Sequence, residues 1–224
     1  MKKRTSTDSL RSLLSTGIIF FMFLYFGLFS NIRAQNYAVV KDIAGFKKLY
    51  DIKTTAINTL KSDFVQEKSI SMMQNKIYSN GSFIIKKTNK LRLEYTNPFA
   101  YIFVMNNDQI VIKNDQGKSS ASISSNKYVK MISQLTIDCI TGNILNSNDF
   151  NVNISENVQA YYLVLIPDQK IIRSLFKEIN ILILKSDFTV DRIELKETSG
   201  DNTTLTFSNK KLNTTVSDEV FNIN

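Results

Sequence analysis

The 224-residue chain has no histidine, no tryptophan, a single cysteine and two prolines. The lack of histidine excludes Ser-His-Asp and Cys-His catalysis, most zinc sites, and the commonest general base near neutral pH. The seven glycines lie apart from one another, so the chain has no glycine-rich phosphate-binding loop. We therefore expect a protein that is not an enzyme and that uses no cofactor or metal.

The one cysteine, Cys139, cannot form an internal disulfide or a thiolate metal cluster. Its neighbours Ile137 and Ile140 are apolar, which favours a small buried hydrophobic residue over a reactive thiol. Cys139 also lies far from the N-terminus, so it is not the lipidated cysteine of a lipoprotein.

Acidic residues are the remaining candidates for catalysis, because aspartate and glutamate together number 20. A carboxylate pair of the kind that glycosidases use stays open as an alternative. Several aspartates are better explained as residues of turns and helix caps, namely Asp63, Asp108, Asp187 and Asp201.

The N-terminal residues 1–35 differ from the rest of the chain. A basic start that includes Lys2 and Arg4 precedes Gly17–Phe29, an uncharged apolar run of 13 residues. That length suits the core of a secretory signal, about 7–15 residues, whereas a membrane-spanning helix needs about 20. We expect a signal peptide over residues 1–35, cleaved near Ala34-Gln35; an uncleaved membrane anchor is the alternative. Residues 36–224 then form one domain.

Basic residues exceed acidic ones, but much of the excess lies in residues 1–35. The whole chain carries a formal charge of +8, whereas residues 36–224 hold 23 Lys+Arg against 19 Asp+Glu. Lysines in this part occur singly or in short pairs such as Lys47-Lys48 and Lys210-Lys211, which is typical of a solvated face. No nucleic-acid partner is expected.

Apolar periodicity predicts three helices. Asp42 can cap an amphipathic helix of about 18 residues, with apolar positions at Ile43, Phe46, Tyr50, Ile57 and Leu60. A second helix is expected over Lys127–Cys139, before Gly142. Pro167-Asp168 can open a short third helix that reaches Ile179.

Period-two patterns predict short strands joined by polar turns. The expected strands are Asp63–Ser71, Tyr78–Lys87, Lys90–Thr96, Phe99–Met105, Gln109–Lys113, Phe150–Ser155, Ala160–Ile166, Ile181–Leu184, Val190–Lys196, Thr203–Ser208 and Phe221–Ile223. Helices are too few to cross over between parallel strands. The predicted fold is mainly β (α+β), an incomplete antiparallel β-barrel of about 10–11 strands with helices packed on its concave side.

The strands hold more apolar residues than a half-solvated sheet needs. In Phe99–Met105 aromatic residues alternate with Ile102 and Val104, so neither face is polar. Both faces of a curled sheet are covered only if helices or another molecule fill the inside. Two interpretations stay open: an ordinary core under the helices, or an apolar pocket for an acyl chain.

Short motifs follow one another in a recognisable order. Asp63–Gln66 reads DFVQ, Gly81–Lys87 reads GSFIIKK, and Leu91–Pro98 reads LRLEYTNP. In order and spacing they resemble the LolA-like family of periplasmic lipoprotein carriers, with its F-x-Q strand and F-R-W-E-Y-x-x-P segment. The resemblance extends through the closing strands and spans about residues 40–224.

This resemblance implies an incomplete barrel, closed by a helical lid, that shelters lipoprotein acyl chains between two membranes. The implied partners are the acylated lipoprotein or lipid cargo, an inner-membrane lipoprotein-releasing transporter and an outer-membrane acceptor. The implied setting is the periplasm of a Gram-negative bacterium, with the protein a monomer. By position, the candidates for the hydrophobic cavity are Phe64, Phe83, Leu91, Leu93, Tyr95, Tyr101 and Phe103.

The resemblance also names a residue that could tie the sheet to the lid. Family members often carry an arginine followed by a proline at the positions that read Lys87-Thr88 in this chain. Lys87 is therefore the candidate lid latch. Lysine keeps the positive charge but offers a point charge in place of a planar five-donor fork.

Two further functions stay open beside the lipoprotein carrier. A LolA-like paralogue would carry another exported lipid or hydrophobic product. A non-catalytic periplasmic interaction module would fill the sheet with its own helices and bind a partner on its outer surface. A solid interior would favour the interaction module. An interior that leaves apolar surface accessible would favour one of the two carriers.

Overall fold

The computed structural model describes residues 36–87, 89–107, 109–114, 117–122, 131, 134–135, 137–139, 141 and 143–222. Residues Tyr37–Asn224 form one compact unit, distinct from Met1–Asn36. The predicted signal peptide, the predicted turn residue Asp108 and part of the predicted helix Lys127–Cys139 lie outside the described residues.

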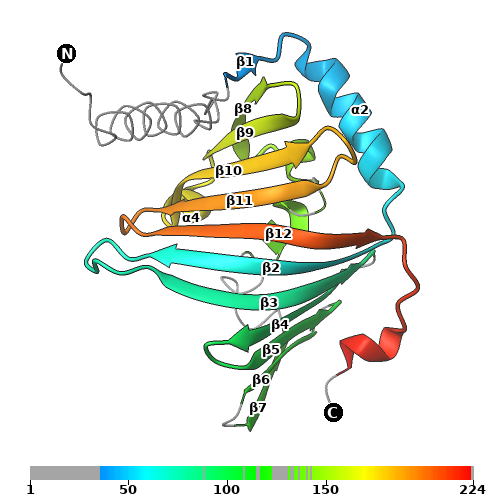
Figure 1. The fold of residues 1–224 in the computed structure, drawn as a ribbon, viewed down its shortest axis with the longest axis vertical. Coiled ribbons are helices and arrows are strands. Elements are labelled where there is room, and N and C mark those ends of the chain that lie inside the picture. The colour runs from blue at the N-terminus through cyan, green and yellow to red at the C-terminus, as the bar shows by residue number, and fades with distance from the viewer. Residues whose placement is uncertain are drawn as a thin grey trace, which may run out of the picture. The chain divides into compact units, whose positions relative to one another are not determined.

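A single antiparallel sheet dominates this unit (Figure 1). Its strands are β1 (Ala38–Val39), β2 (Thr59–Ser69), β3 (Ile77–Lys86), β4 (Lys90–Asn97), β5 (Tyr101–Asn106), β6 (Gln109–Asn114), β7 (Gly117–Ser122), β8 (Phe150–Glu156), β9 (Ala160–Pro167), β10 (Phe176–Leu184), β11 (Val190–Glu197) and β12 (Asn202–Leu212). Their order in space is β1-β8-β9-β10-β11-β12-β2-β3-β4-β5-β6-β7. Among the described residues β1 and β7 are the edges, so the sheet is open and the predicted incomplete barrel is confirmed.

The described sheet has 12 strands, slightly more than predicted. The additions are β1, which is only two residues long, and β7, whose sequence GKSSAS has no apolar alternation. Neither carries the period-two signal on which the sequence prediction relied. Their positions are fixed instead by pairing with β8 and β6.

Helix α2 (Ile43–Thr55) begins as predicted at Asp42, whose carboxylate accepts a hydrogen bond from the backbone N–H of Gly45 at 2.8 Å. It ends at Thr55, earlier than predicted, and Leu60 lies in β2. Leu60 pairs with β3 on one side and β12 on the other. Hydrogen bonding to two strands therefore overrides the helical spacing of that residue.

The third predicted helix is wrong over most of its length. Only α4 (Lys170–Arg173) is helical, and Phe176–Leu184 forms β10. Phe176 and Ile179 fit a helical interval, but Ile179, Ile181 and Ile183 also alternate as a strand requires. All three are at most 1 % exposed between β9 and β11, so burial on a paired strand decides the conformation.

The predicted C-terminal strand Phe221–Ile223 is also wrong at Phe221 and Asn222, and Ile223 lies outside the described residues. Phe221 ends the 3₁₀-helix η3 (Asp218–Phe221), which is capped by the Ser217 hydroxyl accepting from the backbone N–H of Glu219 at 3.3 Å. Phe221 is buried at 2 % exposure, so its apolar character reflects packing rather than strand pairing.

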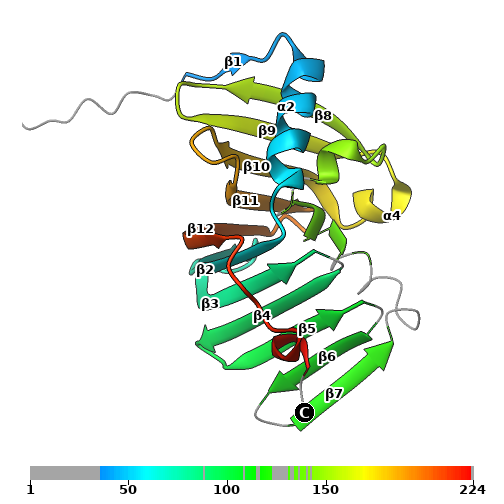
Figure 2. The ribbon, with the colours of Figure 1, turned by 90° about the vertical axis from the view of Figure 1, so that its right-hand side faces the viewer.

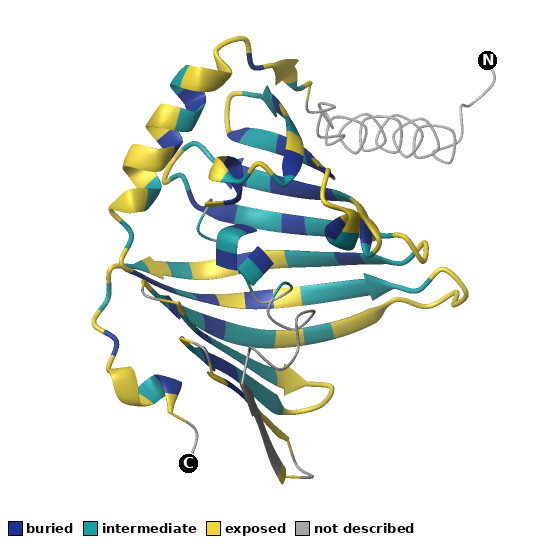
Figure 3. Cartoon of the chain, turned by 180° about the vertical axis from the view of Figure 1, so that it is seen from behind, coloured by how far each residue is buried: buried dark blue, intermediate teal, exposed yellow. Residues whose placement is uncertain are grey.

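The segment between β7 and β8 supplies the remaining helical residues. Met131, Leu135 and Cys139 are helical, in agreement with the predicted helix, and η2 (Asn143–Asn146) follows them. Cys139 is 1 % exposed, so the prediction of a buried cysteine is confirmed. Figure 3 shows this segment in front of the sheet when the molecule is seen from behind.

Candidate functional site

One face of the sheet, which we call the inner face, carries an apolar side chain at most of its positions. The register defines this face, because residues directly opposite each other in paired strands point to the same side. Leu93 lies opposite Phe83 and Phe103, and Tyr95 lies opposite Tyr101. The inner face includes every residue predicted to line a cavity: Phe64, Phe83, Leu91, Leu93, Tyr95, Tyr101 and Phe103. Their role as lining residues stays a prediction.

Burial divides these residues into two sets. Phe64, Phe83 and Leu91 are at most 2 % exposed and belong to the protein's own core. The part-buried set is Leu93, Tyr95, Tyr101 and Phe103, of which Leu93, Tyr95 and Phe103 pack against that core. Ile112 of β6 lies opposite Phe103 and is 41 % exposed. We call the part of this face nearest the β4–β5 turn the open half, namely Leu93, Tyr95, Tyr101, Phe103 and Ile112. Leu91, Met105 and Ile110, at the other end of the same strands, are at most 3 % exposed and belong to the core.

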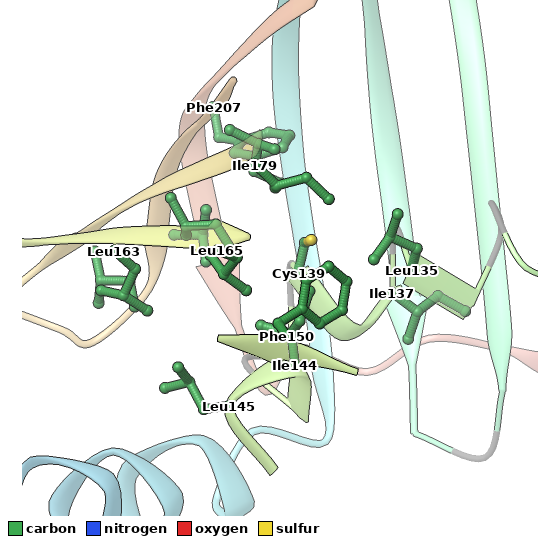
Figure 4. Packing of buried hydrophobic residues seen from close by; sticks show 14 of the residues in the cluster. Leu135, Ile137, Cys139, Ile144, Leu145, Phe150, Leu163, Leu165, Ile179 and Phe207 are labelled. Carbon is green, nitrogen blue, oxygen red and sulfur yellow. The ribbon is translucent and has the colours of Figure 1, made fainter. Parts of the chain in front are cut away.

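The inner face of β8 to β12, the closed half, is covered by the chain itself. Leu163, Leu165 and Ile179 are 0 % exposed. The same buried cluster contains side chains from the segment between β7 and β8, namely Leu135, Ile137, Cys139, Ile144 and Leu145. Figure 4 shows Cys139 and Ile144 on the side toward Leu165, and Leu135 and Ile137 farther from it. Burial raises the pKa of the Cys139 thiol, and the nearby Asp138 carboxylate raises it further. An inert hydrophobic core therefore fills the closed half.

An aromatic cluster marks the end of the open half nearest the β4–β5 turn. Tyr95 stacks on Tyr101 with ring centroids 4.3 Å apart, and Phe64 meets Tyr95 edge-on at 4.9 Å. The Tyr95 hydroxyl donates a hydrogen bond to Gln66 Oε1 at 2.8 Å. Burial raises the pKa of Tyr95, with a further contribution from Tyr101, so this phenol is neutral at physiological pH.

Helix α2 lies along the strand ends of the closed half (Figures 1 and 2). Phe46 packs on Tyr161 of β9 at a centroid distance of 4.5 Å, and Tyr50 faces Phe188 of the β10–β11 turn at 6.4 Å. Burial raises the pKa of Tyr50, next to Cys139. Because α2 covers the inner face at this end of the sheet, it is in the position of a lid.

A cavity of about 140 Å³ lies beyond the C-terminal end of α2. Its apolar lining residues are Ile57, Leu60, Ile85, Ile137 and Phe188. None of the predicted cavity residues lines it, so the sequence prediction missed this space. The alternation of apolar residues in β2 and β3 could have indicated two of its lining residues, because Leu60 and Ile85 share the face of Phe64 and Phe83.

Lys87 connects the sheet to α2. Its ammonium group donates a hydrogen bond to the carbonyl oxygen of Thr55, the last residue of α2. Its backbone N–H donates to the carbonyl oxygen of Asn58 at 2.8 Å. A cation beside the last carbonyl groups of a helix also interacts favourably with the helix dipole. These contacts are those that a lid latch requires, and that function stays a prediction.

The opposite, outer face explains the second set of apolar residues in β5. Val104 is 1 % exposed and packs with Val216 and Phe221 from the C-terminal part of the chain. Ile102 and Ile84 pack at the edge of this cluster. The chain itself therefore covers the outer face at Val104, while Val65 and Ile166 elsewhere on that face stay exposed as single apolar residues.

Two negative observations complete the site. Within the described part of the chain, histidine, cysteine and carboxylate side chains form no cluster suited to a metal ion. No described helix is long and apolar enough to span a membrane.

The geometry defines an open β half-barrel with an apolar interior, partly filled by its own helices. The family model for the outer membrane lipoprotein carrier protein LolA matches residues 55–224, and the chain belongs to this family. The description of the family is that of a carrier of outer-membrane lipoproteins. A search of curated proteins finds no match.

Several solved structures are similar to the chain at low sequence identity. A conserved protein from Thermus thermophilus is 10% identical with a TM-score of 0.52, over 80% of this chain and 92% of that one. A LolA-superfamily protein from Nitrosomonas europaea is 10% identical with a TM-score of 0.43, over 82% and 98%. Lipoprotein LppX from Mycobacterium tuberculosis is 12% identical with a TM-score of 0.43, over 80% and 99%.

Proposed function

We propose that the protein carries the acyl chains of a lipoprotein through the periplasm and shelters them against the open half of the inner face. The observation that supports this proposal most directly is the contrast in burial along one continuous apolar face. Leu163 and Leu165 of the closed half are 0 % exposed, whereas Ile112 of the open half is 41 % exposed. An acyl chain is the kind of molecule that such a surface takes up, since it offers apolar contacts and needs no polar partners.

The size of the hydrophobic effect is sufficient for such a carrier. Burial contributes about 0.8 kcal/mol per methylene, so about ten buried methylenes contribute about 8 kcal/mol. That corresponds to a dissociation constant of about 1 μM before the entropic cost of association is subtracted. Binding of this strength is reversible, as delivery of a cargo requires.

The setting of this carrier follows from the proposed leader and the family. We propose that residues 1–35 direct export and are removed, which places residues 36–224 in the periplasm of a Gram-negative bacterium. A lipoprotein-releasing transporter of the inner membrane would load the open half, and an outer-membrane acceptor would unload it. A single copy of the chain is sufficient for this cycle. A related carrier of another exported lipid would use the same surface.

A charge placed on the inner face tests this function. Replacing Ile112 by Glu puts a carboxylate where the acyl chain would lie, so binding of a fluorescent fatty acid should weaken at least tenfold. Val65→Glu is the matched control, because Val65 is 45 % exposed on the outer face of β2. Fluorescence titration measures both variants, and lipid extraction with mass spectrometry identifies any bound natural lipid.

The outcomes separate the candidate functions. Weak binding by Ile112→Glu together with normal binding by Val65→Glu supports the carrier. If the wild-type protein takes up no acyl probe and holds no extractable lipid, the carrier proposal fails and the interaction module becomes the favoured hypothesis.

A further inference from the structure

The chain continues from β12 into a segment that crosses to the outer face, which we call the strap, Asn213–Asn222. Figure 2 shows it running from the end of β12 past β3 and β4 to η3 near β5. Val216 and Phe221 of the strap bury Val104 on this face. The Arg92 guanidinium donates a hydrogen bond to the Val220 carbonyl oxygen at 3.2 Å. The strap is thus held along its length by apolar packing and polar contacts.

One carboxylate fastens the strap to the sheet. Lys86 and Lys90 lie directly opposite each other on β3 and β4, and like charges in such a pair repel. Asp218 lies between them, with its oxygens 2.6 Å from Lys86 Nζ and 3.0 Å from Lys90 Nζ. Hydrogen bonds from Lys86 and then Lys90 hold the pKa of Asp218 below its ordinary value. Asp218 therefore neutralises a repulsive pair while it attaches the strap.

Asn213, the first residue of the strap, is hydrogen-bonded to the link between α2 and β2. Asn213 accepts a hydrogen bond on Oδ1 from the backbone N–H of Asn58 at 2.7 Å, and its Nδ2 donates to the Ala56 carbonyl oxygen at 3.0 Å. Its own backbone N–H donates to the Thr59 carbonyl oxygen at 2.8 Å. Asn213 has a φ of 54°, a left-handed conformation that asparagine tolerates better than most residues. We call residues 56–58, between α2 and β2, the hinge.

The strap and the latch candidate act on the same hinge from two sides. Lys87 holds Thr55 and Asn58, and it directly follows Lys86, to which Asp218 is bound. Asn213 holds Ala56 and Asn58. The polar contacts of the hinge therefore depend on residues that the strap fixes on the outer face, whereas α2 covers the inner face.

We propose that Asn213 and Asp218 are positioning residues that set, from the outer face, how readily α2 lifts from the inner face. A partner that displaced the strap would loosen the hinge and open the lid without entering the interior. The effect on cargo release rests on the proposed function; the effect on the hinge does not.

Cys139 provides a reporter that needs no ligand. It is the chain's one cysteine, it is 1 % exposed, and it belongs to the same buried cluster as Tyr50 of α2. A thiol reagent therefore reacts with it only when the covering structure opens. The rate of reaction of Cys139 measures local opening, and urea unfolding measures global stability in parallel.

Asn213→Gly removes the side-chain contacts and keeps a backbone that accepts a positive φ. We expect Cys139 to react at least tenfold faster in this variant. The matched control is Asn209→Gly, since Asn209 has a φ of 53° and donates to Asp63 Oδ2 at 2.7 Å, away from the hinge. Its Cys139 should react at the wild-type rate.

Asp218→Asn tests the far end of the strap and keeps the size of the side chain. It should also speed the reaction of Cys139, and Asp218→Glu should restore most of the wild-type rate. Glu178→Gln is the control, because it breaks a comparable exposed ion pair with Lys196, 2.6 Å long, on β10 and β11. Faster reaction in Asp218→Asn but not in Glu178→Gln supports the inference.

Two results would overturn the inference. One is a wild-type reaction rate in both Asn213→Gly and Asp218→Asn. The other is an increase that matches the loss of global stability, since the thiol would then be exposed by unfolding of the whole domain. If Asn213→Gly does not fold, Asp218→Asn alone decides.

Release of a bound fluorescent fatty acid separates this inference from the proposed function. If wild-type protein binds the probe and Asp218→Asn releases it faster, both proposals are supported. If wild type binds the probe and Asp218→Asn releases it at the same rate, the strap does not control release. If wild type binds no probe, the carrier function fails, and the rate of Cys139 reaction still tests the hinge.

Discussion

The closed and open halves of the inner face belong to one sheet and share one strand pattern, yet they differ in what covers them. In the closed half, Leu163 and Ile179 belong to a buried cluster that includes helical residues between β7 and β8. In the open half, Leu93 and Phe103 are part-buried and Ile112 is 41 % exposed. Strand alternation alone therefore does not determine whether an apolar position is structural or available to a ligand. The covering segment determines it.

This difference assigns separate tasks to the halves. The closed half holds side chains with no exposed surface, such as Leu165. Each methylene buried there contributes to the stability of the fold. A half that keeps apolar surface accessible gives up that contribution and gains a surface for another molecule. Substitutions in the closed half should therefore change stability, and substitutions in the open half should change ligand binding.

The largest expected effect is on stability in the closed half. Leu163→Ala removes a side chain that is 0 % exposed, and such a change leaves a cavity in a packed core. The free energy of unfolding should fall by about 2–5 kcal/mol. Ile112→Ala in the open half should cost less than about 1 kcal/mol, because its side chain is already partly in water. Urea unfolding of both variants measures the difference, and equal losses would contradict the division into halves.

An intermediate effect is expected when an acyl ligand is added. A ligand at 100 times its dissociation constant stabilises the folded state by about 2.7 kcal/mol. Because the ligand is proposed to lie on the open half, Leu163→Ala should gain the same stabilisation as the wild type. Ile112→Glu, which binds at least tenfold more weakly, should gain at most about 1.4 kcal/mol at the same ligand concentration. Loss of the stabilisation in Leu163→Ala would show that the ligand reaches the closed half instead.

Much of the fold could be predicted from the sequence because local chemistry and tertiary structure agree there. The cap at Asp42 and the alternation of Leu91, Leu93 and Tyr95 both have local causes, and both are found in the structure. Ile179 was misassigned because its helical spacing and its strand alternation coexist, and only pairing with β9 and β11 decides between them.

The candidate site was predicted only in part. Strand alternation placed Leu93 on one face with Leu91 and Tyr95, and the family resemblance added Phe83, but neither carried information about depth. Phe83 is 2 % exposed, whereas Leu93 is part-buried, because different segments cover them in three dimensions. The contacts of Asn213 with the hinge join residues far apart in sequence, and no local pattern predicts them.

The smallest expected effect concerns a single hydrogen bond at the edge of the open half. Tyr95→Phe keeps the ring that stacks on Tyr101 and removes the hydroxyl that donates to Gln66. The free energy of unfolding should fall by about 0.5–1.5 kcal/mol, the usual net contribution of one such bond.

Tyr161→Phe is the control for this substitution in the closed half. The Tyr161 ring packs on Phe46 and lies under the Lys185 ammonium group, and the substitution keeps both contacts. Its stability should change little.

Burial raises the pKa of Tyr95, so the neutral phenol that donates to Gln66 is stabilised on folding. That contribution is complete below the ordinary tyrosine pKa of about 10 and is lost only at higher pH. Unfolding measured at pH 7 therefore reports the hydrogen bonding of the Tyr95 hydroxyl. An equal loss in both variants would assign the effect to the phenol groups in general rather than to the open half.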